Sequence, residues 1–520
     1  MKTLSIFEKV AMKKVSRNKF DLSHDVKMSF NMGDLIPMFC EEVIPGDIFR
    51  INPTVMLRFA PLVAPVMHRV NVVVDFYFVP NRILWSEWEK FITGGDTGTD
   101  NPVHPYIQFE ADKVVAIGSL ADYLGIPTGT VGEPFKVNPL PFAAYVKIWD
   151  EFYRDQNLMD GLYDEYTLTS GDNPDYLDFI EAATLLKRSW ERDYLTSALP
   201  YAQKGDSVQI PLVSQDNLPV EFMQDTAADP VWRDPSTSTL RTGSVTGQNP
   251  GGNVLVGGQE GAYDPDGSLT VDVQAGATNI ETLRRAFRLQ EWLEKQARAG
   301  TRYIESILAH FGVRSSDARL QRPEFIGRSR QNMVISEVLS TADTANAPVG
   351  QMAGHGISVG GGSFNYSAEE HGWIIGLVNV QPTTAYQDGL ARKFQRFDKF
   401  DYAWPTFANL GEQAITRAEV RCMVVDGIDL KATWGYIPRY SEYKFANNRV
   451  AGEMRDSLDF WHLGRKFASY NVPLNEDFLL CNPSYRIFAV TDPHVHHVYA
   501  HIFNQCTALR KLPVFGIPTI

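Results

Sequence analysis

Hydrophobic and polar residues alternate in several short stretches of this chain, as expected for β-strands. In the clearest stretch, residues 70–79, the even-numbered positions are all valine or phenylalanine and would share one face of a strand. Similar patterns predict strands at Ile48–Phe59, Trp373–Val380, Val420–Val425, Tyr485–Thr491 and Val495–Cys506. Because such widely spaced strands must pair at long range, without a regular strand–helix alternation, the pattern favours an antiparallel sandwich with large insertions.

Helical periodicity is found between the predicted strands. After Pro141, apolar residues recur at helical spacing and predict an amphipathic helix. Its apolar face would hold Tyr145, Ile148, Trp149 and Phe152. Thr278 and Glu281 have the spacing of a capping box and open a second predicted helix, which Gly300 ends. A short third helix is predicted just before Gly312. We expect these helices to be connectors and contact surfaces.

One segment, residues 234–277, is rich in Gly, Ser, Thr, Asn and Asp and poor in apolar residues. Such a composition cannot bury enough surface to form a core. The sequence therefore predicts an exposed insertion loop, with a small hairpin between Val254–Val256 and Leu269–Val273.

Composition is that of a globular chain able to bury a core, with 44% hydrophobic and 21% charged residues among 520. The sequence contains no run of about 18 apolar residues, so no membrane-spanning helix is predicted. The N-terminal region lacks the pattern of a secretory signal. The four cysteines lie far apart without a Cys-x-x-Cys pair, which argues against a zinc site or a disulfide framework and suits a reducing cytoplasm.

Charge is unevenly distributed along the chain. The net charge is −13, but Met1–Phe20 carries six cations against Glu8, a net +5 that leaves −18 on the remainder. The nucleic-acid-binding candidates in this basic arm are Lys13, Lys14, Arg17 and Lys19. Such cations neutralise phosphates without reading sequence. An ordinary solvated terminus is the alternative, and the arm's apolar residues could also pack against a neighbouring subunit.

The most specific catalytic pattern is Gly356-Ile357-Ser358-Val359-Gly360, which has the Gly-x-Ser-x-Gly spacing of a nucleophile elbow. An elbow requires a helix after the serine. The residues that follow are further glycines and then Ser363-Phe364-Asn365-Tyr366, so we expect a flexible loop and no hydrolase.

Histidines and carboxylates offer two weaker candidates. His494, His496, His497 and His501 cluster in sequence, but on a strand they would divide between opposite faces, which favours surface or interface histidines over a metal site. The adjacent pairs Glu41-Glu42 and Glu369-Glu370 would also point apart, which favours solvated or interfacial side chains over glycosidase acids.

Several motifs spread over the whole chain resemble one protein family. They include Phe20-Asp21-Leu22-Ser23-His24, Glu42-Val43-Ile44-Pro45-Gly46-Asp47, Gly300-Thr301-Arg302-Tyr303, Tyr402-Ala403-Trp404-Pro405, Arg439-Tyr440-Ser441-Glu442-Tyr443-Lys444 and Pro513-Val514-Phe515-Gly516-Ile517-Pro518. In these motifs, and in their order, the chain resembles the major capsid protein of the Microviridae, small icosahedral single-stranded DNA bacteriophages. The gokushovirus-like branch is the most similar.

The resemblance implies a mainly β protein, an eight-stranded antiparallel jelly roll with long helix- and loop-containing insertions. It implies a structural protein rather than an enzyme, with no cofactor and no metal. Sixty copies, assembling through pentamers, would close a T=1 shell around a circular single-stranded DNA genome. Implied partners are the chain itself, the genome, a small basic DNA-packaging protein, a DNA pilot protein and a host surface receptor. The expected location is the virion, after assembly in the bacterial host cytoplasm.

The resemblance also divides the chain. Residues 1–20 would form the basic arm and residues 21–520 a single jelly-roll capsid domain. The insertion at 234–277 would form a surface protrusion at the three-fold axes that contributes to host attachment.

Aromatic and charged residues gather between Tyr386 and Arg455, where we predict subunit contacts. The predicted interface residues are Tyr402, Trp404, Tyr436, Arg439, Tyr440, Tyr443 and Arg449. Some of these rings could instead fill the jelly-roll core.

Two other classes of protein fit parts of the sequence. A carbohydrate-binding or carbohydrate-cleaving β-sandwich would use the abundant aromatic residues to stack on sugars, and glycan turnover by a soluble monomer would favour it. A viral spike or pilot protein is the other alternative, although it need not carry motifs along the whole chain.

Overall fold

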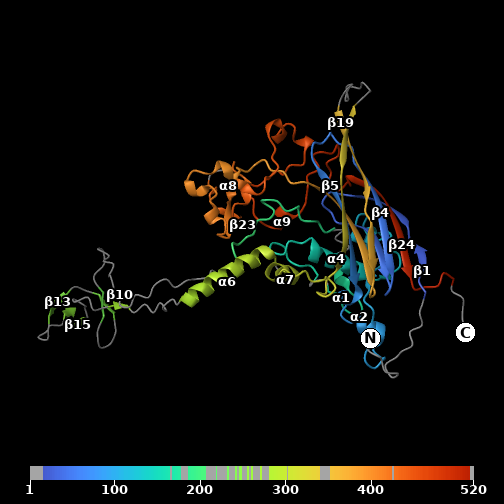
Figure 1. Ribbon diagram of the computed structural model, residues 1–520, viewed down its shortest axis with the longest axis horizontal. Helices are drawn as coiled ribbons and strands as arrows, with labels where there is room; N and C mark the ends of the chain where they lie inside the picture. The colour runs from blue at the N-terminus through green and yellow to red at the C-terminus, as the bar shows by residue number, and fades with distance from the viewer. Residues whose placement is uncertain are drawn as a thin grey trace. The chain divides into compact units, whose positions relative to one another are not determined.

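The computed structural model describes most of the chain (Figure 1). The described residues are 16–163, 167–176, 185–205, 218–219, 231–233, 240–242, 245–248, 254–256, 259–261, 270–271, 280–300, 302–339, 352–423 and 427–515. The chain divides into two compact units, one of Met1–Lys204 with Glu294–Ile520 and one of Gly205–Leu293.

The first unit is built on two antiparallel sheets. The seven-stranded sheet has the order β1-β24-β4-β19-β18, with β2 also on β24 and β20 also on β4. Its strands are β1 (Asn18–Asp21), β2 (His24–Phe30), β4 (Ile48–Phe59), β18 (Val334–Leu339), β19 (Met352–Gly361), β20 (Phe364–Ser367) and β24 (Val498–Arg510). The four-stranded sheet has the order β17-β5-β21-β3. Its strands are β3 (Ile36–Val43), β5 (Val70–Pro80), β17 (Glu324–Asn332) and β21 (Gly372–Pro382).

The two sheets face each other across one hydrophobic core. Phe49, Val55 and Leu57 of β4 contribute to this core, as do Val74 and Phe76 of β5. The alternation predicted for residues 70–79 is confirmed, because the even-numbered side chains from Val70 to Phe78 all lie in this core. The strands predicted at 48–59 and 373–380 are confirmed as β4 and β21. The first unit is therefore an antiparallel β-sandwich, as the sequence predicts.

A second core covers the other face of the four-stranded sheet. It contains Tyr77 and Val79 of β5 together with helix α4 (Leu140–Phe152), which lies beside the strands in Figure 1. The helix predicted after Pro141 is thus confirmed. Tyr145 in α4 donates a hydrogen bond to the carbonyl of Leu35 at 2.9 Å, which ties the helix to the start of β3. Both faces of the four-stranded sheet are therefore buried.

The other elements of this unit are short. The helices are α1 (Asn81–Leu84), α2 (Trp88–Thr93), α3 (Leu120–Tyr123), α7 (Tyr303–Phe311), α8 (Arg417–Val420) and α9 (Glu476–Leu479). The small strands are β6 (Ile107–Phe109), β7 (Val114–Val115), β8 (Gly129–Thr130), β9 (Phe135–Val137), β22 (Glu412–Thr416) and β23 (Thr433–Pro438). The 3₁₀ turns are η1 (Arg392–Phe394), η2 (Lys399–Asp401), η3 (Pro405–Phe407), η4 (Ser441–Tyr443), η5 (Gly452–Arg455) and η6 (Asp459–Trp461).

The glycine-rich segment around Ser358 is a strand, so the predicted flexible loop is wrong. Strand β19 pairs with both β4 and β18, and Ser358 is buried and donates a hydrogen bond to the carbonyl of Asn332 at 3.1 Å. A Cβ at Gly354 would lie 2.5 Å from the carbonyl oxygen of Ala64. The glycines are needed for close backbone approach inside a sheet rather than for flexibility.

Two other predicted strands, 420–425 and 485–491, are also wrong where the structure describes them, and residues 424–425 lie outside the described residues. Val420 ends helix α8, because Thr416 and Glu419 form a capping box that starts a helical turn there. Residues 485–491 form turns that press Phe488 into the core, with a single bridge to Leu62. Capping in the first segment and core packing in the second account for the apolar residues, so neither segment needs to pair as a strand. The strand predicted from Val495 begins later, as β24.

The described part of the second unit consists mainly of short strands. They are β10 (Leu218–Pro219), β11 (Val231–Arg233), β12 (Leu240–Thr242), β13 (Val245–Gln248), β14 (Val254–Val256), β15 (Gln259–Gly261) and β16 (Thr270–Val271). The predicted hairpin is wrong in its pairing, because β14 pairs with β13 and β15 while β16 pairs with β10.

The two helices predicted around residue 300 are confirmed. Helix α6 (Ile280–Ala299) begins in the second unit and ends in the first, and the predicted cap at Thr278 lies outside the described residues. Helix α7 ends at Gly312, which has a φ of 69°. This left-handed conformation favours glycine as a C-terminal cap.

Candidate subunit interface

The aromatic stretch forms a lobe without long strands or helices, which we call the aromatic lobe (residues 390–445). Its backbone follows η1 to η4 around the two-stranded ladder of β22 and β23. Many large side chains of the lobe are exposed, and Phe397 is 90% exposed. The exposed apolar side chains are Phe394, Phe397, Phe400, Tyr402, Trp404, Leu410, Met423, Tyr443 and Phe445. Solvent-exposed rings at this density are typical of a surface that a partner covers.

Hydrogen bonds hold the central rings of the lobe by their polar edges. The backbone N–H of Trp404 donates to the hydroxyl of Tyr440, and that of Ala403 donates to the hydroxyl of Tyr443, both at 3.2 Å. The indole N–H of Trp404 donates to the carbonyl of Lys399 at 2.8 Å. These hydrogen bonds engage polar atoms of Trp404 and Tyr443 within the lobe. Both residues nevertheless remain about half exposed.

A largely buried arginine supports these rings. The guanidinium of Arg396 lies 4.3 Å from the ring centroid of Tyr443 and 5.7 Å from that of Tyr402. It also donates to Glu442 at 3.2 Å, and Glu442 accepts a further bond from Gln413 at 2.6 Å. A cation held between aromatic faces and a carboxylate fixes the positions of both rings. The prediction from sequence missed Arg396, although its place inside the aromatic run was a usable signal.

The structure brings together only part of the predicted interface set. Tyr402, Trp404 and Tyr443 are exposed around a buried Tyr440, whose ring meets that of Tyr443 edge to face at 6.1 Å. The guanidinium of Arg439 lies 5.0 Å from the Tyr440 ring centroid. Within this subunit Tyr440 therefore positions the exposed rings.

Two predicted interface residues lie apart from this cluster. Tyr436, in β23, is half-buried and exchanges backbone hydrogen bonds with Leu199. Arg449 is exposed and follows the lobe, where its backbone bridges to Tyr386. Their roles in subunit contacts stay predictions.

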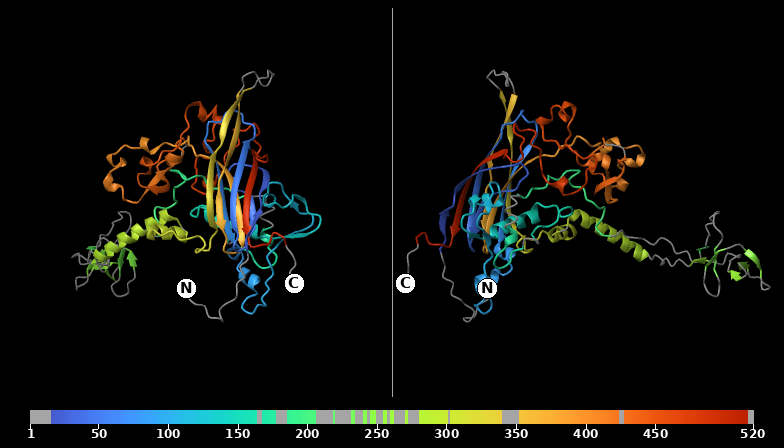
Figure 2. Two further views of the ribbon diagram at one scale, coloured as in Figure 1. Left: turned by 45° about the vertical axis from the view of Figure 1, so that its right-hand side comes forward. Right: turned by 180° about the vertical axis from the view of Figure 1, so that it is seen from behind.

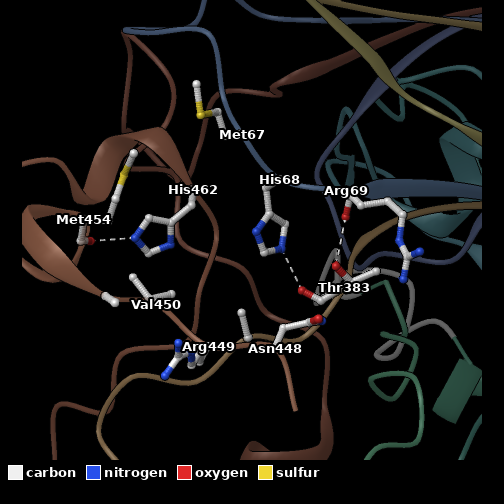
Figure 3. Close-up of a pocket in the computed structure, with 11 residues that line it drawn as sticks. Met67, His68, Arg69, Thr383, Asn448, Arg449, Val450, Met454 and His462 are labelled. Carbon is white, nitrogen blue, oxygen red and sulfur yellow. Dashed lines mark hydrogen bonds between the residues drawn. The ribbon is translucent and has the colours of Figure 1, made fainter. Parts of the chain in front are cut away.

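A pocket of about 440 Å³ lies near the start of β5 (Figure 3). It is lined by Met67, His68, Arg69, Thr383, Ala385, Asn448, Arg449, Val450, Ala451, Met454 and His462. His68 Nε2 donates to the carbonyl of Thr383 at 2.7 Å, and His462 Nε2 donates to that of Met454 at 2.7 Å (Figure 3). Burial lowers the pKa of His68 to about 4, so its imidazole is neutral at pH 7. Because these lining residues include no carboxylate, the pocket provides no acid–base pair.

Three of the clustered histidines have separate side-chain partners, which are Ser29 for His496, Asn31 for His497 and Asp25 for His501. His497 is buried, with ring contacts to Tyr485 and Phe488 and hydrogen bonds to Asn31 and to the carbonyl of Val490. Only His501 lies in β24, so the expectation that all four share one strand is wrong. In the part of the chain that the structure describes, no group of three or more His, Cys, Asp and Glu is arranged to hold a metal ion.

The basic arm is described only at its end. Lys13 and Lys14 lie outside the described residues. Arg17 donates to the carbonyl of Gly46 at 2.9 Å, and Lys19 is exposed on β1. Among the carboxylate pairs, Glu370 forms an ion pair with Arg82 at 2.7 Å.

The comparisons with known proteins agree and cover most of the chain. The family described as "Capsid protein (F protein)" matches residues 8–520, and the chain belongs to this family. It is 34% identical to the capsid protein VP1 of Chlamydia phage 1, over 98% of this chain and 97% of that protein. It is 33% identical to the capsid protein VP1 of Bdellovibrio phage phiMH2K, over 98% and 97% of the two chains. Identity to the capsid protein VP1 of Spiroplasma virus 4 is 30%, over 87% and 86%.

These findings confirm the resemblance to the capsid proteins of the gokushovirus-like Microviridae. The chain is a structural capsid protein of a bacteriophage virion, and the family assignment favours this over a carbohydrate-cleaving sandwich. Among the described helices, none has both the length and the apolar character needed to cross a bilayer.

Proposed function

We propose that the chain is the major subunit of a T=1 icosahedral shell, in which sixty copies enclose a circular single-stranded DNA genome. The observation that carries this proposal is the family match over residues 8–520. The sandwich supports it, because β17-β5-β21-β3 make one four-stranded layer and β2, β24, β4 and β19 make four long strands of the other. In the proposed shell these two layers form an eight-stranded jelly roll.

The aromatic lobe supplies subunit contacts in this proposal. Obligate interfaces bury on the order of 2,000 to 5,000 Å², and their anchors are enriched in Trp, Tyr and Arg. Trp404, Tyr402 and Tyr443 offer such anchors on a support that is already hydrogen-bonded. Closed symmetry then multiplies each contact around the shell.

Electron microscopy and sedimentation of the purified protein test this function. Uniform closed shells, or pentamers that convert into them, are the expected result. The chain should be coexpressed with its small basic DNA-packaging protein and its DNA pilot protein if it does not assemble alone. Persistent monomers under those conditions would contradict the proposal.

Trp404→Ala tests the role of the lobe directly. We expect it to block assembly, measured as the yield of sedimenting particles. Phe397→Ala, which removes a more exposed ring of the same lobe, is the matched comparison. Wild-type particle yield from Trp404→Ala would exclude an anchor at this position.

The insertion at 234–277 is proposed to protrude at the three-fold axes and to contact a host surface receptor. Deletion of residues 243–267 should leave particle assembly intact and reduce adsorption to host cells. Loss of particles on deletion would assign the segment to the shell instead.

The basic arm is proposed to contact the genome. Neutralising Lys13, Lys14 and Arg17 should lower the ratio of DNA-filled to empty particles more than it lowers the total particle number, because each cation neutralises a phosphate. An unchanged ratio would remove the arm from packaging.

A further inference from the structure

The seven-stranded sheet has an uncovered outer face. In β4, buried side chains alternate with exposed or half-exposed ones along the whole strand, and β24 shows nearly the same alternation. The left view in Figure 2 looks onto this sheet, and none of the described helices crosses its central strands there. This face is therefore exposed, whereas both faces of the four-stranded sheet are buried.

Three rings follow one another along the outer face of β24. Tyr499, His501 and Phe503 alternate with the buried Ala500 and Ile502. Tyr499 is 46% exposed and Phe503 is 40% exposed. Side chains two residues apart on one strand are about 7 Å from each other. The face thus carries a regular row of half-exposed rings.

Cations on the two neighbouring strands flank this row. Arg58 of β4 lies directly across from Tyr499, and Lys27 of β2 lies directly across from His501. Arg50 continues the row on β4, across from Thr507. All three cationic residues are exposed. Residues directly opposite each other on antiparallel strands have Cα atoms about 4.5–5.5 Å apart, so Arg58 and Lys27 lie beside the row of rings. Arg50 lies on the same face, beyond the Phe503 end of the row.

The carboxylates of this face are already engaged. Asp25 lies 2.9 Å from His501, and Asp21 accepts hydrogen bonds from the backbone and hydroxyl of Ser23. Within the described residues, Lys27, Arg50 and Arg58 form no ion pair with a carboxylate. A chain with a net charge of −13 therefore presents cations and half-exposed rings together on one face of a sheet.

We propose that the outer face of the seven-stranded sheet binds single-stranded DNA, with bases stacked on the ring row of β24 and phosphates held by Arg58, Lys27 and Arg50. This inference rests on the proposed function and gives it a second DNA-binding surface besides the basic arm. A row of rings flanked by cations suits a strand whose bases and phosphates repeat at a regular spacing. Exposed bases can stack only when they are unpaired, so duplex DNA should bind more weakly.

Binding of single-stranded DNA to this outer face, which we call the platform, is tested on the full-length protein. The measurement is fluorescence anisotropy with a labelled 20-nucleotide oligothymidylate at several salt concentrations. Tyr499→Leu with Phe503→Leu keeps the apolar surface and removes the aromatic faces. We expect about tenfold weaker binding per ring with an unchanged salt dependence. Phe397→Leu, a ring of the aromatic lobe, is the matched control and should leave binding unchanged, and Phe503→Tyr should keep it.

The cations are tested by Arg50→Gln with Arg58→Gln. Affinity falls with salt, and each lost phosphate contact makes the slope of log affinity against log salt less steep by about 0.7 for single strands. The double variant should therefore have a slope less steep by about 1.4. Arg314→Gln, an exposed arginine far along the chain, is the control and should leave the slope unchanged. No binding by the wild type at low salt, or equal effects in variants and controls, would overturn the proposal.

Particles provide a second readout that does not depend on free subunits. Ultraviolet crosslinking of DNA-filled particles, followed by mass spectrometry, should find nucleotide adducts on peptides of β24. Adducts confined to other peptides would reject the platform. If the leucine variant blocked shell assembly while binding oligothymidylate like the wild type, the face would be a subunit contact. If the protein bound oligothymidylate but formed no shells, the proposed capsid assembly would be rejected and the proposed DNA-binding face would stand.

Discussion

The two sheets of the sandwich use similar strands in different surroundings. Every residue of β5 in the four-stranded sheet is buried, because one face meets the seven-stranded sheet and the other meets α4. In β4 of the seven-stranded sheet, only alternate side chains are buried. One sheet is therefore a structural centre in which every position is constrained, and the other has a face free for partners. Substitutions on the two sheets should separate stability from assembly and binding.

The largest expected effect is in the core between the sheets. Phe76 of β5 is fully buried, and Phe76→Ala should lower the free energy of unfolding by about 3–5 kcal/mol, because it removes contacts and leaves a cavity. Thr54→Ala, on the outer face of β4, should change it by less than about 0.5 kcal/mol. Denaturant unfolding of the unassembled subunit measures both. Equal losses would contradict the contrast between the sheets.

An ion pair on the second core should be almost as sensitive. Asp75 of β5 is buried and accepts bonds from Arg328 at 2.6 and 2.9 Å and from Tyr153 at 2.7 Å. Arg328→Met leaves the carboxylate buried without its cation and should cost about 3 kcal/mol. Asp75→Asn in the same background should recover part of this loss. No recovery in a thermal unfolding series would show that the lost packing, and not the charge, is responsible.

Acid should destabilise the subunit through His68, which immediately precedes Arg69 and β5. Burial lowers its pKa to about 4, whereas an unfolded histidine titrates near pH 6.5. Between these values only the unfolded chain takes up the proton. The contribution is complete above pH 6.5 and is lost as the pH falls toward 4, by up to about 3 kcal/mol. Unfolding free energies measured across this range should fall less steeply for His68→Gln. Identical slopes would exclude His68 as a source.

The smallest effect is expected on the exposed sheet face. His501 and Asp25 are each about half exposed, and solvent screens their interaction. His501→Gln should therefore change the free energy of unfolding by at most about 1 kcal/mol, measured by the same denaturant titration. A loss as large as that of Arg328→Met would mean that the outer face is held as tightly as the buried sheet.

The sequence predicts correctly those strands and helices in which the spacing of hydrophobic residues matches the spacing of buried side chains. Residues 70–79 alternate strictly, and the structure places them in β5 with the predicted faces. The helix over 140–152 and the glycine stop at Gly312 were also readable, because periodicity and capping act within a few residues. Motifs spread over the whole chain indicate the capsid family without reference to the fold.

Local patterns do not predict which strands pair or where two backbone segments come into close contact. The glycines around Ser358 suggested a loop, yet they allow β19 to lie against the backbone at Ala64, which is distant in sequence. Val254–Val256 forms a strand as predicted but pairs with other partners. Local sequence states which segments favour extension, but it does not state which segments meet.

The candidate interface shows the same division. Aromatic composition pointed to the stretch that became the aromatic lobe, and Tyr402, Trp404 and Tyr443 are exposed there. That Tyr440 is buried, and that Arg396 contacts Tyr443 as well as the nearby Tyr402, depends on contacts between residues about forty positions apart.

The sequence by itself determined the capsid family, the sandwich class and the strands and helices with strong periodicity, because these depend on local patterns and on motifs in order. Only the tertiary structure decided that one sheet is buried on both faces while the other leaves Tyr499 and Arg58 side by side and exposed. The reason is physical: β24 and β4 are more than four hundred residues apart, and their neighbouring side chains are set by strand register, which long-range pairing fixes.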